Sequence, residues 1–224
     1  PILLYAVYVP LFLALYLLVL IVICKHRKPL FNSSFYSIFS VLSVVNIAAC
    51  LLSSFVFRLH LYPLFHEFYA SLWESSGWLT ASYAGAYFLN CLSEFLHVLL
   101  AFNRFTAVYF PVRHDQIWRR TMLLGIAVCL VLSLAPVVHL FKYNTYFAMI
   151  FAETYTIFFQ SIWLNMAIVT VVCNSASILL YGACLIRLCA TSQTRNHTAE
   201  RNLFLISFLT MIASLPYMYA MSKF

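Results

Sequence analysis

Charged side chains are scarce in this chain of 224 residues. Lys and Arg together number 13 and Asp and Glu only 6, so charged residues make up 8% of the sequence. Soluble domains carry roughly 25% charged residues, which their water-facing surface requires. With 64% hydrophobic and 18% aromatic residues, this chain is solvated mainly by lipid.

Glycine is also rare, with 4 residues, and the hydrophobic segments are continuous. A membrane β-barrel would show alternating segments of about ten residues, whereas each charge-free run here can cross a bilayer core about 30 Å thick. The runs predict an all-α, polytopic helical membrane bundle that forms a single domain over residues 1–224. Its six expected transmembrane helices span residues 2–24, 34–57, 77–108, 121–141, 161–188 and 201–221.

The basic residues are distributed unevenly when the connections are assigned alternately to the two membrane faces. One face receives ten of the thirteen, and the positive-inside rule makes that face cytoplasmic and the amino terminus extracellular. The net charge of +7 is therefore explained by topology and by attraction to the lipid bilayer, without a nucleic-acid partner. The ten residues are Lys25, Arg27, Lys28, Arg104, Arg113, Arg119, Arg120, Arg187, Arg195 and Arg201.

Motifs of enzymes and metal sites are missing. The chain has no His-Glu-x-x-His, no Gly-x-Ser-x-Gly and no Cys-x-x-Cys, which are the patterns typical of zinc proteases, hydrolases and redox or zinc sites. The sequence therefore predicts no enzymatic activity, no cofactor and no metal.

The segment 77–108 carries polar residues at helical spacing. Asn90, Glu94, His97 and Arg104 follow steps of four, three and seven, which place them on one stripe of a helix. A charge near the bilayer midplane costs roughly 3 kcal/mol, so we expect this stripe to face the bundle or a water-filled cavity. Two interpretations of Glu94 stay open: a ligand-sensing or switching group, and a buried structural carboxyl.

A ligand pocket is expected around this stripe, because small-molecule sites combine aromatic walls with a few polar groups. The candidate ligand-binding residues are Tyr83, Tyr87, Asn90 and Glu94, with Trp163 and Tyr217 from other helices. A polar switch in the bundle would comprise Asn46, Glu94, His97 and Pro216, since buried Asn bonds between helices and Pro makes a hinge. Simple bundle packing is the alternative for each.

The end of segment 77–108 resembles a known superfamily. Asn103-Arg104-Phe105, followed by Ala107-Val108 and Pro111-Val112, is similar to the end of the third helix in rhodopsin-like G-protein-coupled receptors. The stretches "NRFTAVYFPVRHDQIW", "FNSSFYSIFSV" and "ERNLFLIS" resemble, more specifically, the nematode chemoreceptors of serpentine receptor class gamma.

The resemblance implies a seven-helix receptor in the plasma membrane of a chemosensory neuron, with the seventh helix absent from this chain. Such a receptor binds an environmental small molecule and activates a heterotrimeric G protein on the cytoplasmic side. The residues implied in G-protein coupling and activation are Asn103, Arg104, Phe105, Pro111 and Val112. Asn103 stands where the superfamily has an acidic residue, so an ionic restraint on Arg104 from that position is missing.

Two alternatives remain beside the receptor. Buried Glu94 and His97 would suit a proton-coupled membrane transporter, although the chain has no inverted repeat. The chain would also suit a truncated receptor paralogue that does not signal.

Overall fold

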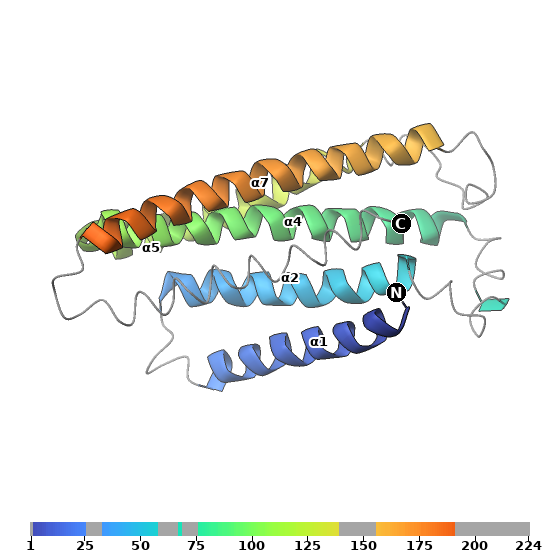
Figure 1. Ribbon diagram of the computed structural model, residues 1–224, viewed down its shortest axis with the longest axis horizontal. Helices are drawn as coiled ribbons and strands as arrows, with labels where there is room; N and C mark the ends of the chain where they lie inside the picture. Colours follow the sequence, from blue (N-terminus) through green and yellow to red (C-terminus); the bar gives the residue numbers. More distant parts are fainter. Residues whose placement is uncertain (1, 26–32, 58–66, 69–75, 139–155, 191–224) are drawn as a thin grey trace.

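The computed structural model describes residues 2–25, 33–57, 67–68, 76–138 and 156–190. Long α-helices account for nearly all of them and run side by side along one axis (Figure 1). They are α1 (Ile2–Lys25), α2 (Ser34–Phe57), α4 (Ser76–Tyr109), α5 (Pro111–Leu134) and α7 (Thr156–Ala190).

Four helices are long and apolar enough to cross a membrane. The candidate membrane spans are Ser34–Val56, Ala81–Tyr109, Pro111–Leu134 and Leu164–Arg187, and a shorter apolar segment, Val9–Lys25, lies in α1. The described residues contain no β-strand. The predicted all-α membrane bundle is thus confirmed, while the expected helix over residues 201–221 lies outside the described residues.

Helix α4 occupies the centre of the described bundle. It packs against α2, α5 and α7, whereas α1 packs mainly against α2. The largest fully buried side chains come mainly from α2 and α4, among them Ile38, Leu42, Leu96 and Leu100. Because α4 is surrounded by protein on several sides, its polar residues meet other helices rather than lipid.

Helix α5 begins ten residues before the predicted start at residue 121. Pro111 takes the first helical position, where its fixed φ suits a helix and its missing N–H is not needed, and Phe110 before it adopts a non-helical φ of −130°. The predicted start at residue 121 is set by the long run without charged residues that begins there. The helix itself begins earlier, in a stretch that contains charged residues. It ends at Leu134 rather than 141, because Pro136 cannot donate the next hydrogen bond.

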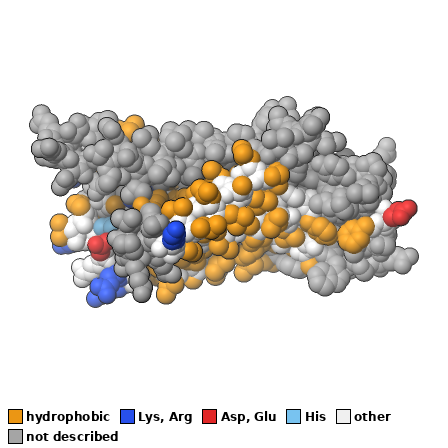
Figure 2. Space-filling view, turned by 90° about the horizontal axis from the view of Figure 1, so that it is seen from below, with side chains coloured by type: hydrophobic (Ala, Val, Ile, Leu, Met, Phe, Trp, Pro, Cys, Tyr) orange, Lys and Arg blue, Asp and Glu red, His pale blue; other side chains and the backbone are white. Residues whose placement is uncertain are grey.

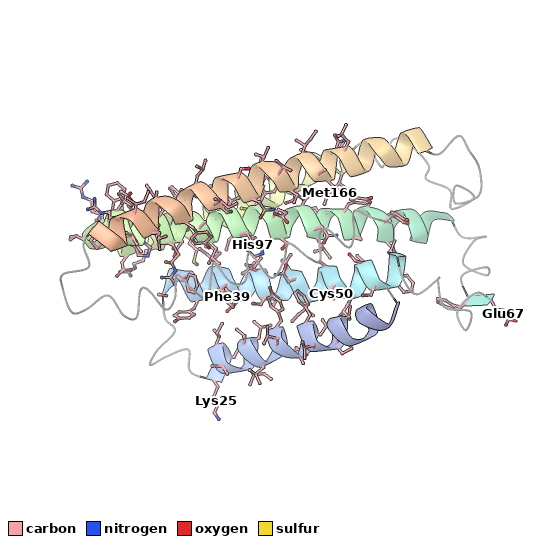
Figure 3. The ribbon with its side chains drawn as sticks, in the orientation of Figure 1. Lys25, Phe39, Cys50, Glu67, His97 and Met166 are labelled. Atoms are coloured by element: carbon pink, nitrogen blue, oxygen red, sulfur yellow. The ribbon has the colours of Figure 1, made fainter. Side chains whose placement is uncertain are left out.

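Basic side chains gather at one end of the bundle. The start of α2 meets the end of α4 through Phe35 and Arg104, and the ends of α4 and α7 meet through Tyr109 and Arg187. Figure 2 shows hydrophobic side chains over the middle of one face, with Lys and Arg toward one end. Lys25 lies toward this end and Glu67 at the opposite one (Figure 3). By the positive-inside rule the basic end is cytoplasmic.

Candidate functional site

Asn46 joins three helices near the middle of α2. Its Nδ2 donates to the Tyr16 hydroxyl of α1 at 3.0 Å, and its Oδ1 accepts from the Ser93 hydroxyl of α4 at 2.5 Å. Hydrogen bonds between membrane helices contribute roughly 0.6 kcal/mol each on average. Asn46 therefore links α1, α2 and α4 through its side-chain amide.

The predicted pocket residues on α4 face different neighbours. The rings of Tyr83 and Tyr87 are stacked with centroids 6.3 Å apart, and Tyr87 packs in a cluster with Met166 of α7. Asn90 instead bonds toward α2, since its Nδ2 donates to the Ser53 hydroxyl at 3.3 Å. The tyrosines thus lie beside α7, whereas Asn90 is engaged with α2.

Glu94 lies at the interface of α4 and α7 and is only 4% exposed. Asn174 of α7 donates to Glu94 Oε2 at 3.4 Å, which is a long hydrogen bond, and the same amide group donates to the Thr170 carbonyl at 2.9 Å. Within the described residues no cationic side chain pairs with Glu94. The carboxyl group therefore keeps most of its hydrogen-bonding capacity.

Further buried polar atoms on these helices have no hydrogen-bond partner in the described part of the chain. On α7 they are the hydroxyl oxygens of Thr170 and Ser177, one turn to either side of Asn174. His97 Nε2 of α4 is also without a partner, but His97 follows Ser93 by one turn on the side of α4 that bonds to α2. Buried polar atoms are nearly always paired, so these groups keep hydrogen-bonding capacity inside the bundle.

Three predicted residues cannot be placed in this site. Trp163 belongs to α7, but its side chain lies outside the described part of the structure. Tyr217 and Pro216 lie outside the described residues altogether.

Arg104 is packed inside the cytoplasmic end of the bundle and is 8% exposed. Its guanidinium carbon lies 3.4 Å from the centroid of the Phe35 ring at the start of α2. A cation held over a desolvated aromatic ring is stabilised by about 2 kcal/mol or more. A contact between a cation and an aromatic ring thus restrains Arg104 here, where the neighbouring Asn103 cannot form an ion pair.

Asn103 is fully buried beside it and begins a ring of hydrogen bonds. Its Nδ2 donates to the Ser34 hydroxyl of α2 at 2.9 Å. Thr106 donates its hydroxyl proton to the Asn103 carbonyl at 2.9 Å and accepts from the Trp118 indole N–H of α5 at 2.7 Å.

His114 of α5 closes this ring. The Thr106 hydroxyl has already donated its only proton, so His114 Nδ1, at 3.1 Å from it, must be the donor. His114 Nε2 lies 3.5 Å from the Ser34 hydroxyl. The ring of contacts therefore joins α2, α4 and α5.

The other residues of the coupling motif lie at the same end. Phe105 stacks on Tyr109 with centroids 4.4 Å apart, and the Tyr109 hydroxyl donates to the Ala183 carbonyl of α7 at 3.2 Å. Pro111 starts α5, and Val112 after it is 95% exposed. Asn103 and Arg104 are therefore internal, whereas Val112 faces outward.

Sequence reasoning missed Ser34, Phe35, His114 and Trp118 as parts of this end. His114 and Trp118 are four residues apart, the spacing of one helix face. This spacing indicates a shared helix face only if the helix is taken to begin at Pro111, whereas the predicted helix begins at residue 121. Ser34 and Phe35 carry no local signal, because their role depends on where α2 meets α4.

The fold and these contacts define a helical membrane protein with buried polar groups and an arginine packed on a phenylalanine at the end of its central helix. A family model described as Srg family chemoreceptor matches residues 2–222. The chain therefore belongs to the Srg chemoreceptor family, a family of membrane receptors rather than of enzymes.

Curated relatives agree with this membership. The chain is 31% identical to serpentine receptor class V-1 of Caenorhabditis elegans over 76% of this chain and 58% of that protein. It is 29% identical to serpentine receptor class gamma-5 over 48% of this chain and 34% of the relative, and 28% identical to class gamma-9 over 50% and 33%. This chain therefore covers at most 58% of the length of these relatives.

Proposed function

We propose that this chain belongs to a chemosensory receptor that binds a small molecule from the environment and activates a heterotrimeric G protein. Its place would be the plasma membrane of a chemosensory neuron. Membership of a chemoreceptor family supports the receptor part of this proposal.

The ligand would bind between α4 and α7. Glu94 is buried there with one long hydrogen bond, and Thr170 and Ser177 of α7 bring hydroxyl oxygens that no described residue satisfies. Tyr83 and Tyr87 supply stacked aromatic surface on the outer side. Asn90, Trp163 and Tyr217 remain proposed contributors to the same pocket.

The observation that carries the proposal is the position of Arg104 at the cytoplasmic end of the central helix. It is buried on Phe35, so its five N–H donors become available to a partner only if α2 and α4 separate locally. We propose that ligand binding favours this rearrangement, and that Asn103, Arg104, Phe105, Pro111 and Val112 form the surface that the G protein meets. Asn46, Glu94, His97 and Pro216 would link the two sites.

The test uses the full-length receptor in membranes, with GTPγS binding by added G protein as the readout. A panel of volatile and water-soluble compounds is screened first, and any active compound is then applied to Arg104→Ala and to Lys25→Ala. Lys25 is a matched control because it is an exposed cation at the same membrane face. We expect loss of the response in R104A alone.

Normal signalling by R104A at normal surface expression would overturn the role of Arg104. Glu94→Gln tests the ligand site separately, and an unchanged concentration dependence would remove Glu94 from it. Compound-dependent flux into proteoliposomes without any GTPγS response would favour the proton-coupled transporter instead.

A further inference from the structure

The outward face of α5 changes character along its length. Beyond Thr121 its exposed side chains are apolar, with Leu123 75%, Leu124 64% and Val131 66% exposed. The opposite face carries the buried residues of the helix, among them Trp118 and Cys129. This part of the outward face is therefore covered by lipid hydrocarbon.

Before Thr121 the same helix is basic. Arg113, Arg119 and Arg120 are all exposed, and within the described part of the chain none of their guanidinium groups takes part in a hydrogen bond or an ion pair. Asp115 is the one acidic residue between Pro111 and Thr121. We call Arg113, Arg119 and Arg120 the α5 arginine face.

Arg113 and Arg120 lie on the same side of the helix. They are seven residues apart, or about two turns, and Gln116 stands between them at helical spacing. Two guanidinium groups and an amide thus follow one stripe, and Arg119 flanks it. All of these side chains are exposed, whereas Trp118 on the other side of the helix is buried against the bundle.

The depth of these residues identifies the kind of anion. At about 1.5 Å per residue, Arg119 and Arg120 lie roughly 5 Å outside Leu123 and Leu124, at the level of lipid phosphates. Arg113 lies about 10 Å further along the helix than Arg120. Headgroups occupy only about 5 to 7 Å per leaflet, so Arg113 reaches beyond the ordinary phosphate layer. A single phosphodiester cannot contact the whole face.

We propose that the α5 arginine face binds a phosphorylated inositol lipid of the cytoplasmic leaflet. The phosphodiester would lie at Arg119 and Arg120, beneath acyl chains that follow the apolar stripe of α5, and the ring phosphates would extend to Arg113. Guanidinium groups match phosphate geometry through paired N–H donors, and each basic residue near the cytoplasmic surface adds about 1 kcal/mol of attraction to anionic lipid.

Other basic residues at this end do not belong to the face. Arg187 of α7 lies over the Tyr109 ring at 4.8 Å, and Lys25 ends a different helix, α1, which packs on α2. Lys25 thus serves as a control of equal charge at the same membrane surface, outside the proposed site.

The experiment is native mass spectrometry of the purified full-length receptor with equal amounts of phosphatidylinositol 4,5-bisphosphate, phosphatidylserine or phosphatidylcholine. We expect bound bisphosphate lipid to exceed bound phosphatidylserine clearly. Arg113→Gln and Arg120→Gln should each weaken its binding by about fivefold, whereas Lys25→Gln should leave it unchanged. Asp115→Asn, which removes the neighbouring negative charge, should strengthen it.

Two results would overturn the proposal. Equal binding of phosphatidylserine and the bisphosphate lipid would show attraction to surface charge alone, and equal losses in R120Q and K25Q would show that the position on α5 is irrelevant. Retention on size-exclusion chromatography checks that each variant is folded. Should R120Q fail that check, R113Q decides, because its position in the first turn of α5 is remote from the buried core.

Discussion

Replacing Phe35 by leucine is expected to release Arg104 and to raise the signalling of the receptor without ligand. The guanidinium carbon lies 3.4 Å from the ring centroid, and both residues are buried, so the contact is worth about 2 kcal/mol. If all of this free energy favours the packing in which Arg104 is hidden, the ratio of the exposed to the hidden arrangement rises by about 30-fold.

Leucine is chosen because it keeps an apolar side chain at the position. Phe→Ala in a core costs about 3 to 5 kcal/mol, which would confuse loss of the contact with loss of folding. Phe39→Leu is the matched control, since Phe39 is buried one turn further along α2 and stacks on Phe35 at 5.8 Å. Its position is labelled in Figure 3.

The assay measures GTPγS binding without added compound, in membranes normalised for receptor at the surface. F35L should raise this basal rate and F39L should not. A basal rate in F35L equal to that of the unmodified receptor, or an equal rise in F39L, would refute the view that the Phe35 ring restrains Arg104. Arg104→Lys tests the same contact from the other side, because lysine keeps the positive charge but lacks the planar guanidinium group that stacks on the Phe35 ring.

The remaining predictions concern stability, measured as melting temperature of the purified protein. Asn46→Leu breaks bonds to two other helices and should destabilise by about 1 to 2 kcal/mol; an unchanged melting temperature would contradict its role. Trp118→Phe removes the 2.7 Å hydrogen bond from the indole N–H to Thr106 of α4 and should lower the free energy of unfolding by about 1 kcal/mol. An unchanged melting temperature would show that this hydrogen bond does not stabilise the bundle. Gly182→Ala, with nothing within 4 Å of the added Cβ, should stabilise by up to about 1 kcal/mol, whereas Gly125→Ala should gain less, because its Cβ meets the Leu99 side chain at 3.0 Å. Equal shifts in the two glycine variants would show that contact does not decide the outcome.

Helix existence and length could be read from the sequence because the bilayer imposes them. The predicted ranges 2–24, 34–57 and 77–108 end within one residue of α1, α2 and α4. The predicted start of α5 at residue 121 is ten residues late, because hydrophobicity falls before Thr121 although the helix continues there. Pro111 is the local signal of the true start, since proline favours the first position of a helix.

The partners of the candidate site were beyond the sequence. Spacing alone placed Asn90, Glu94 and Arg104 on one stripe, yet Asn90 bonds to α2, Glu94 to α7, and Arg104 lies on a phenylalanine of α2. Neighbouring residues on one stripe meet different helices because α4 is enclosed on several sides.

The class of protein, the positions of most spans, the basic end of the bundle and the family resemblance all follow from the amino-acid sequence. Each depends on properties carried along the chain, namely hydrophobic length, charge and motif. That Arg104 lies on Phe35 and that His114 closes a ring with Ser34 and Thr106 became known from the packing of the helices. Such contacts depend on how helices rotate and cross, which is the sum of many weak packing interactions and has no local code.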